Sequence, residues 1–169
     1  MQVREARPAD EPFIAELYVA SRRAAWREIV DEAHDGLDVE EEGRELLTDF
    51  APRDAGWRVV VGEEKGRIVG FVTFVGDGVS HTGHVGALFV SPDRFRSGIG
   101  TSLLDAATTT LVDGGCDDAI LWTLEEESKL MAFYAHRGWR PDGARQIVEL
   151  DRSRTVVRLR KPLLARSAP

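Results

Sequence analysis

The segment Leu88–Leu104 combines the residue types that bind a phosphate group. An apolar strand stops at a proline, two arginines follow, and two glycines open a run of leucines and alanines at helical spacing. Gly98 and Gly100 can adopt backbone angles closed to other residues and let a ligand approach closely. The N–H groups of the helix's first turn, with Arg94 and Arg96 beside them, therefore predict a phosphate site made chiefly of backbone.

The glycine spacing separates this turn from two other phosphate-binding motifs. A Rossmann turn has three glycines at another spacing, and a Walker loop continues into Gly-Lys-Ser/Thr, and this chain has neither pattern. The turn alone is equally compatible with an ordinary helix start. The functional interpretation therefore depends on the wider pattern.

That wider pattern, Val-x-Pro followed by Gly-Ile-Gly and Leu-Leu, resembles the coenzyme A pyrophosphate loop of the GNAT superfamily of N-acetyltransferases. The family often has Arg or Gln three residues before the first glycine, where this chain has Phe95. We interpret Phe95 as subfamily variation, because the phosphate contacts are mostly main chain. The resemblance assigns these residues to cofactor binding: Leu88, Phe89, Val90, Arg94, Phe95, Arg96, Ser97, Gly98, Ile99, Gly100 and Thr101.

A second block, Leu121–Trp139, is similar to the family pattern of a strand, an asparagine, a helix with Phe-Tyr, and then Gly-Phe or Gly-Trp. Phe133-Tyr134 and Gly138-Trp139 match, whereas Glu127 stands at the asparagine position. That asparagine typically touches the pantetheine arm, so we expect cofactor contacts to differ here. Glu127, Lys129 and Phe133 complete the predicted cofactor site.

The resemblance implies direct transfer of an acetyl group from acetyl-CoA to an amine. A lysine-like amine has a pKa of about 10 and must lose a proton before it attacks, so a base is required. Backbone N–H groups around Leu88 to Val90 are expected to polarise the thioester carbonyl and to pair with the pantetheine arm. Tyr134 matches the family tyrosine near the thioester sulfur and is predicted to donate to the departing thiolate. Without the motif it would be interpreted as a core tyrosine.

His84 is the predicted base, because it aligns with the glutamate of the histone-type enzymes when both are counted from the glycines. A second position that is commonly acidic holds Gly86 and Ala87. A histidine with an ordinary pKa of about 6.5 is a competent base at neutral pH. A surface histidine without a catalytic role is the alternative, and His81 and Glu125 are other candidate bases.

The acceptor side is the least defined part of the predicted site. Trp26 and Glu125 are assigned to substrate binding, although a tryptophan on a helix is more often a core residue. The acidic segment Ile29–Glu42 is either a solvated loop or a wall that attracts amines. The sequence leaves open whether the acceptor is a small molecule or a protein, and whether the acyl group is longer than acetyl.

Composition restricts the class of protein. The net charge of −7 argues against a nucleic-acid partner and favours a cationic substrate. Cys116 is the single cysteine and the four histidines lack metal spacing, so we expect neither a disulfide nor a metal. No apolar run approaches the about 20 residues of a membrane span. Met1–Glu5 lacks an apolar signal region, and a cytoplasmic protein without a membrane partner is expected.

The order of the predicted elements indicates a mixed α/β sheet, in the GNAT acyl-CoA N-acyltransferase fold with about six or seven strands and about four helices. One domain is expected over 1–164, with a disordered tail at 165–169. Strands are expected at 2–7, 57–63, 68–75, 84–90, 119–124, 146–150 and 155–161, and helices at 11–28, 40–50, from the glycine turn to 113, and at 128–137. Asp10 and Ser128 are expected to cap helices.

Two functions follow from these patterns. The first is a coenzyme A-dependent N-acetyltransferase acting on a primary amine. The second is a catalytically silent acyl-CoA sensor, which is kept because Phe95, Glu127 and the missing acidic pair depart from the family pattern. Retention of Tyr134 favours the enzyme. Homodimers are common in such folds, but no residue here requires one.

Overall fold

The computed structural model describes residues 1–29, 56–149 and 153–163. The predicted helix at 40–50, most of the acidic segment and the tail at 165–169 lie outside these ranges. The chain forms two compact units, 1–75 with 86–109 and 76–85 with 110–169, and the domain boundary 1–164 stays a prediction. No helix within the described ranges is long and apolar enough to cross a membrane.

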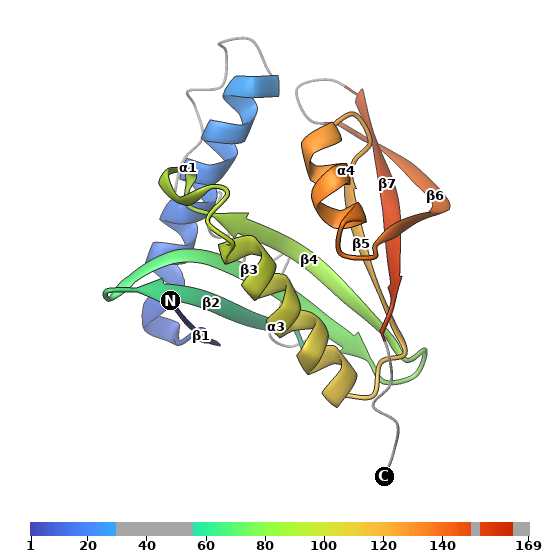
Figure 1. Cartoon of the computed structure of the whole chain (residues 1–169), viewed down its shortest axis with the longest axis horizontal. Helices are drawn as coiled ribbons and strands as arrows, with labels where there is room; N and C mark the ends of the chain where they lie inside the picture. The colour runs from blue at the N-terminus through green and yellow to red at the C-terminus, as the bar shows by residue number, and fades with distance from the viewer. Residues whose placement is uncertain (30–55, 150–152, 164–169) are drawn as a thin grey trace. The chain divides into compact units, whose positions relative to one another are not determined.

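A seven-stranded sheet in the order β1-β2-β3-β4-β5-β7-β6 confirms the predicted mixed α/β class (Figure 1). The strands are β1 Gln2–Glu5, β2 Arg58–Glu64, β3 Arg67–Asp77, β4 Thr82–Val90, β5 Asp118–Leu124, β6 Arg140–Glu149 and β7 Ser153–Pro162. The helices of the described ranges are α1 Glu11–Ile29, α3 Ile99–Asp113 and α4 Ser128–Ala135, with short 3-10 turns η1 Pro8–Asp10 and η4 Pro92–Arg94.

In the first unit, α1 covers one face of the antiparallel strands β1, β2 and β3. Ile14, Leu17 and Tyr18 recur at helical spacing, so they share one face of α1. They pack with Val61 of β2 and Phe71 of β3, which are paired in register and are fully buried. This cluster fixes α1 against the sheet.

The first turns of α3 cover the opposite face of the same strands. Gly62 and Gly70 are the next paired residues along β2 and β3, and because side chains alternate along a strand they face away from α1. Ile99 and Leu103 of α3 lie directly over Gly70. The missing side chains therefore let the start of α3 pack closely on the sheet.

Two capping predictions were wrong. Asp10 precedes α1, but its carboxylate accepts the Arg7 N–H at 2.7 Å and pairs with Arg4 at 2.7 Å. The bond to Arg4 holds the pKa of Asp10 below its usual range, so Asp10 joins β1 to the η1 turn and does not cap the helix. Ser128 is the first residue of α4, and Glu127 occupies the N-cap position without a side-chain bond.

The second unit contains the first half of β4, the strands β5, β7 and β6, the end of α3, and α4. Thr82–Val85 runs parallel to Asp118–Leu121, and β7 pairs antiparallel with both β5 and β6. β6 begins at Arg140, six residues before the predicted start at Gln146. The first half of β6 was not predicted, because proline, aspartate and glycine have low strand propensity and the pairing is irregular between Pro141 and Arg145.

The close packing at Gly70 gives the first testable prediction. A Cβ at residue 70 would lie 2.9 Å from both Ile99 Cγ2 and Leu103 Cδ1, and 3.0 Å from the Phe89 carbonyl oxygen. Because Leu103 and Ile99 are buried, we expect Gly70→Ala to lower the free energy of unfolding by about 1–3 kcal/mol, as measured by urea denaturation.

The matched control is Gly78→Ala, because a Cβ at residue 78 would meet no atom within 4 Å. It should change the free energy of unfolding by less than about 0.5 kcal/mol. Equal stability of the Gly70 variant and the wild type would contradict the close approach.

Candidate functional site

The predicted phosphate turn is a short η4 helix followed by a left-handed segment. The Arg94 N–H donates to the Ser91 carbonyl at 2.8 Å, which closes the η4 turn. Arg96 and Gly98 then have φ of +62° and +85°, a region that costs little only for glycine. A Cβ at residue 98 would meet no atom within 4 Å, so the space beside Gly98 is open.

Helix α3 begins directly after this turn. Its bond from the Ser102 N–H to the Gly98 carbonyl spans 3.0 Å, and the N–H groups of the first turn have no carbonyl partner inside the helix. Residues 95–98 are exposed. The turn therefore presents main-chain donors at the positive end of the helix dipole, which suits an anion.

The two arginines of the turn differ in their surroundings. Arg94 donates through both terminal nitrogens to the carboxylate of Glu64, one bond spanning 3.0 Å. Its side chain is 37% exposed and that of Glu64 is 23% exposed. Arg96 is exposed. One of the two predicted cations is thus already paired with a carboxylate.

The end of β4 is fixed from two sides. The Ser91 N–H donates to the Val69 carbonyl of β3 at 2.9 Å, and the Ser21 hydroxyl of α1 donates to the Val90 carbonyl at 2.9 Å. The Phe89 ring stacks on Phe71 at 5.6 Å. Since alternate residues direct their main-chain groups to the same edge, residues 88 and 90 face the edge away from β3.

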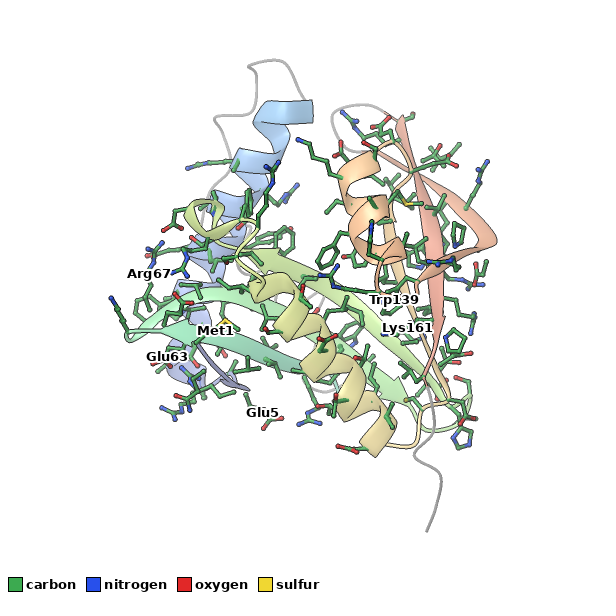
Figure 2. The ribbon with its side chains drawn as sticks, in the orientation of Figure 1. Met1, Glu5, Glu63, Arg67, Trp139 and Lys161 are labelled. Atoms are coloured by element: carbon green, nitrogen blue, oxygen red, sulfur yellow. The ribbon has the colours of Figure 1, made fainter. Side chains whose placement is uncertain are left out.

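Tyr134 lies near the end of α4 among aromatic rings. Its ring meets Phe133 edge-on at 5.1 Å and Trp139 at 6.3 Å between centroids, and its side chain is 9% exposed. Burial raises the pKa of Tyr134 to about 12. Helix α4 ends at Ala135, two residues before the predicted end, and Gly138, with φ of +83°, turns the chain into the fully buried Trp139, labelled in Figure 2. The phenol is therefore a neutral donor at physiological pH.

The other predicted cofactor residues of the second unit lie along α4. The Glu127 carbonyl accepts the Met131 N–H at 2.9 Å and so begins the helix. Lys129 is exposed. Phe133 is half-buried under the guanidinium of Arg137, which lies 3.9 Å from the ring centroid. Glu127 thus contributes main-chain geometry at the position where the family pattern has an asparagine.

His84 is exposed on β4 and pairs with Ile120 of β5. Desolvation lowers the pKa of His84, and the charges of Arg158 and Arg160 lower it further, while Asp77 and Asp118 oppose them. The imidazole is therefore neutral at physiological pH. A neutral imidazole can accept a proton.

Two residues on this sheet face were not predicted from the sequence. Trp122 follows Ile120 by two positions on the same face, and it pairs in register with Arg158. The Arg158 guanidinium lies 5.8 Å from the Trp122 ring centroid and donates to Asp142 at 2.8 Å. Because β5 is a nearly continuous apolar run, its composition does not show which of its residues share the sheet face of His84. Strict period-two counting from Ile120 would have found Trp122.

The alternative base His81 closes a turn. Its Nδ1 lies 2.9 Å from the Gly115 carbonyl oxygen, and its own carbonyl accepts the Asp117 N–H at 2.7 Å. The adjacent Cys116 is buried, and burial raises the pKa of its thiol. These contacts give both residues a structural role.

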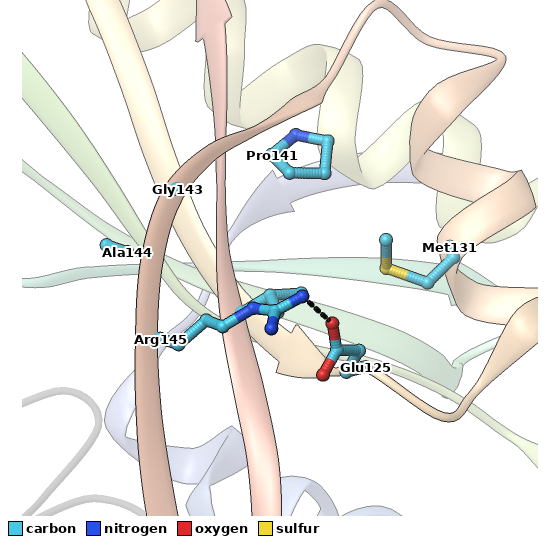
Figure 3. Close-up of a pocket in the computed structure, with 7 residues that line it drawn as sticks. Glu125, Met131, Pro141, Gly143, Ala144 and Arg145 are labelled. Atoms are coloured by element: carbon cyan, nitrogen blue, oxygen red, sulfur yellow. Dashed lines mark hydrogen bonds and ion pairs between the residues drawn. The ribbon is translucent and has the colours of Figure 1, made fainter.

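Glu125 lines a pocket of about 120 Å³ in the second unit. Figure 3 shows its carboxylate directed at Arg145 of β6, with which it forms an ion pair, and Met131 and Pro141 across the pocket. The charge of Glu125 is thus compensated locally. The side chain of Trp26, the other predicted acceptor residue, lies outside the described residues.

The structure places the predicted residues in both units. The phosphate turn and residues 88–90 belong to the first unit, and His84, Glu125 and α4 with Tyr134 belong to the second. Among the residues that the structure describes, no group of three His, Cys, Asp or Glu side chains could hold a metal.

Two kinds of similarity identify the family. Residues 23–139 match the acetyltransferase (GNAT) family model. The chain is 30% identical over 148 residues to a probable N-acetyltransferase of Mycobacterium tuberculosis, covering 85% of this chain and 82% of the relative. It is 30% identical over 141 residues to the peptidyl-lysine N-acetyltransferase YjaB of Salmonella typhimurium, covering 82% and 88%.

A solved structure supports the fold. YncA of Salmonella typhimurium, determined with its cofactor acetyl-CoA, superposes with a TM-score of 0.72 at 20% identity, covering 100% of this chain and 97% of that chain. The family match and the two relatives confirm the resemblance drawn from the glycine turn and the Phe-Tyr helix. The chain belongs to the GNAT family of N-acetyltransferases.

Proposed function

We propose that this N-acetyltransferase moves an acetyl group directly from acetyl-CoA to a primary amine, with Tyr134 as the donor to the departing thiolate. The observation that carries the proposal is the burial of Tyr134, which keeps its phenol protonated to about pH 12. The open glycine turn supports acetyl-CoA as the acetyl donor, because its main-chain N–H groups suit the pyrophosphate of coenzyme A. The lysine side chain of a peptide is the first acceptor to test, given the relative that is named for peptidyl-lysine.

The proposed reaction requires two proton movements. The amine nitrogen forms a bond to the thioester carbonyl carbon and gives one proton to the base, while the carbon–sulfur bond breaks. The electron pair of that bond leaves on sulfur as a thiolate, which accepts a hydrogen bond from Tyr134 and then takes a proton from water. The products are an amide and the coenzyme A thiol, and the base returns its proton to water. A main-chain N–H at residues 88–90 stabilises the negative charge that develops on the carbonyl oxygen.

The raised pKa of Tyr134 defines how it acts. An ordinary thiol has a pKa of about 8.5, so a phenol with a pKa of about 12 does not give up its proton completely to the thiolate. It donates a charge-assisted hydrogen bond that strengthens as charge accumulates on sulfur. Tyr134 therefore stabilises the transition state more than the bound substrate.

His84 is the proposed base, directly or through water. Its lowered pKa keeps the ring neutral at physiological pH, so it can take the proton that the attacking amine loses. Exposure on the sheet face gives the ring access to solvent. The acidic net charge of −7 favours arrival of a cationic amine.

Replacing the phenol tests the donor role. We expect Tyr134→Phe to lower kcat by about 10²-fold, because one hydrogen-bond donor to the transition state is lost, and to change the KM for acetyl-CoA by less than about threefold. Thiol release from acetyl-CoA would be followed with a lysine peptide, a peptide with a free N-terminal alanine, and a set of small amines.

Tyr18→Phe is the matched control, since Tyr18 is the other tyrosine of the chain and is equally buried. It should leave kcat within about twofold. Undiminished kcat in Tyr134→Phe would refute the assignment. Absence of thiol release with every amine, despite calorimetric binding of acetyl-CoA, would favour the catalytically silent sensor.

The base is tested by the pH dependence of kcat at saturating substrates. Only neutral imidazole accepts a proton, so activity should fall as the pH drops through the pKa of His84, with a midpoint below 6.5 because desolvation lowers that pKa. His84→Gln should remove this acid limb and lower kcat by about 10²-fold.

His136→Gln serves as the control, because the His136 ring bonds its own helix at the Ala132 carbonyl. It should leave the acid limb unchanged. Persistence of the limb in His84→Gln would rule out His84, and its loss in His81→Gln would assign the base to His81.

A further inference from the structure

We infer that Arg94 positions the pyrophosphate turn by pairing with Glu64, and that it is not the ligand of a coenzyme A phosphate. The inference rests on the proposed function, because it concerns how that cofactor is bound. It assigns a role in cofactor binding to the hairpin between β2 and β3, which no part of the glycine motif includes.

The hairpin places two opposite charges at a fixed separation. Lys65 and Gly66 have φ of +51° and +78°, the geometry of a tight two-residue hairpin turn. Glu64 and Arg67 flank this turn and are paired in register. The hairpin therefore holds one carboxylate and one guanidinium side by side at the end of the two strands.

The phosphate turn presents the complementary pair. Arg94 donates through two nitrogens to Glu64, and Arg67 donates to Asp93 at 3.2 and 3.4 Å and to the Ser91 hydroxyl at 3.2 Å. The two ion pairs thus have opposite polarity, so a shift of the turn against the hairpin would bring like charges together. This arrangement specifies one position of the turn.

Of the two ion pairs, the one between Glu64 and Arg94 contributes most to holding the turn against the hairpin. Both pairs are two-bond carboxylate–guanidinium contacts, but the side chains of Glu64 and Arg94 are 23% and 37% exposed, whereas those of Arg67 and Asp93 are 63% and 54% exposed. Two-bond pairs are stronger and more directional than single contacts, and exposed pairs are weakened by salt. Glu64 and Arg94 are therefore the residues to change first.

The backbone of the turn explains why it must be held. Arg96 has φ of +62°, which is unfavourable for a residue with a side chain. Such a conformation persists only when neighbouring contacts determine it. The Arg94 carbonyl accepts the Ser97 hydroxyl at 2.6 Å, so Arg94 is bonded to the hairpin through its side chain and to the strained segment through its main chain.

The two possible roles of Arg94 predict opposite effects of removing Glu64 on the affinity for coenzyme A. If Arg94 binds phosphate, Glu64 competes for the same guanidinium, and its removal should tighten coenzyme A binding. If the pair holds the turn, removal of either partner should weaken binding. Glu64→Gln, Arg94→Met and the double variant would be compared by calorimetry with coenzyme A at low salt.

We expect each single variant to weaken the Kd about fivefold or more, and the double variant to be no weaker than the worse single variant. The charge exchange Glu64→Arg with Arg94→Glu should restore the Kd to within about threefold of the wild type. In kinetics, the KM for acetyl-CoA should rise in the single variants while kcat stays within about twofold.

Glu63→Gln is the matched control, because it removes the same charge from the neighbouring residue, labelled in Figure 2. Glu63 pairs with Arg4 at 2.8 Å. This control variant should leave the Kd unchanged. Tighter binding by Glu64→Gln, no rescue in the charge exchange, or an equal effect of Glu63→Gln would overturn the inference while the proposed function stands. Absence of coenzyme A binding by the wild type would overturn the proposed function, and the inference with it.

Discussion

The close approach of α3 to the strands beneath it determines where the phosphate turn lies. Ile99 and Leu103 rest on Gly70, and the turn precedes Ile99 immediately. The first N–H groups of α3 are thus placed by packing against a buried sheet face, not by loop contacts alone. Because interiors are packed like crystals, an anion site built on such a helix end is held in a nearly fixed position.

The two arginines of the phosphate turn differ, because Arg94 is bonded to the hairpin and Arg96 is exposed. The net charge of −7 opposes the approach of an anionic coenzyme, and one arginine of the turn is paired with Glu64. Main-chain N–H groups remain as donors that carry no counter-charge. The acidic balance instead favours the approach of the cationic amine proposed as the acceptor.

The sequence predicted features that depend on neighbouring residues, but not ion pairs between residues far apart in the chain. The glycine turn and most strand positions depend on neighbouring residues, and the structure agrees with them. The partners of Arg94 and Arg145 are 30 and 20 residues away, and no spacing rule identifies them. The predicted cap at Asp10 failed for a local reason, because its carboxylate is bonded to Arg4 and to the Arg7 N–H, six and three residues away.

Two of the departures from the family pattern lie where main-chain atoms determine the local geometry. Phe95 lies in a turn shaped by backbone angles, and Glu127 begins α4 through its carbonyl. Such positions tolerate different side chains because the contacting atoms are common to all residues. Tyr134 differs, since the role proposed for it depends on one hydroxyl and on burial that raises its pKa. Substitution should therefore be tolerated at Phe95 and Glu127, whereas loss of the Tyr134 hydroxyl should not be.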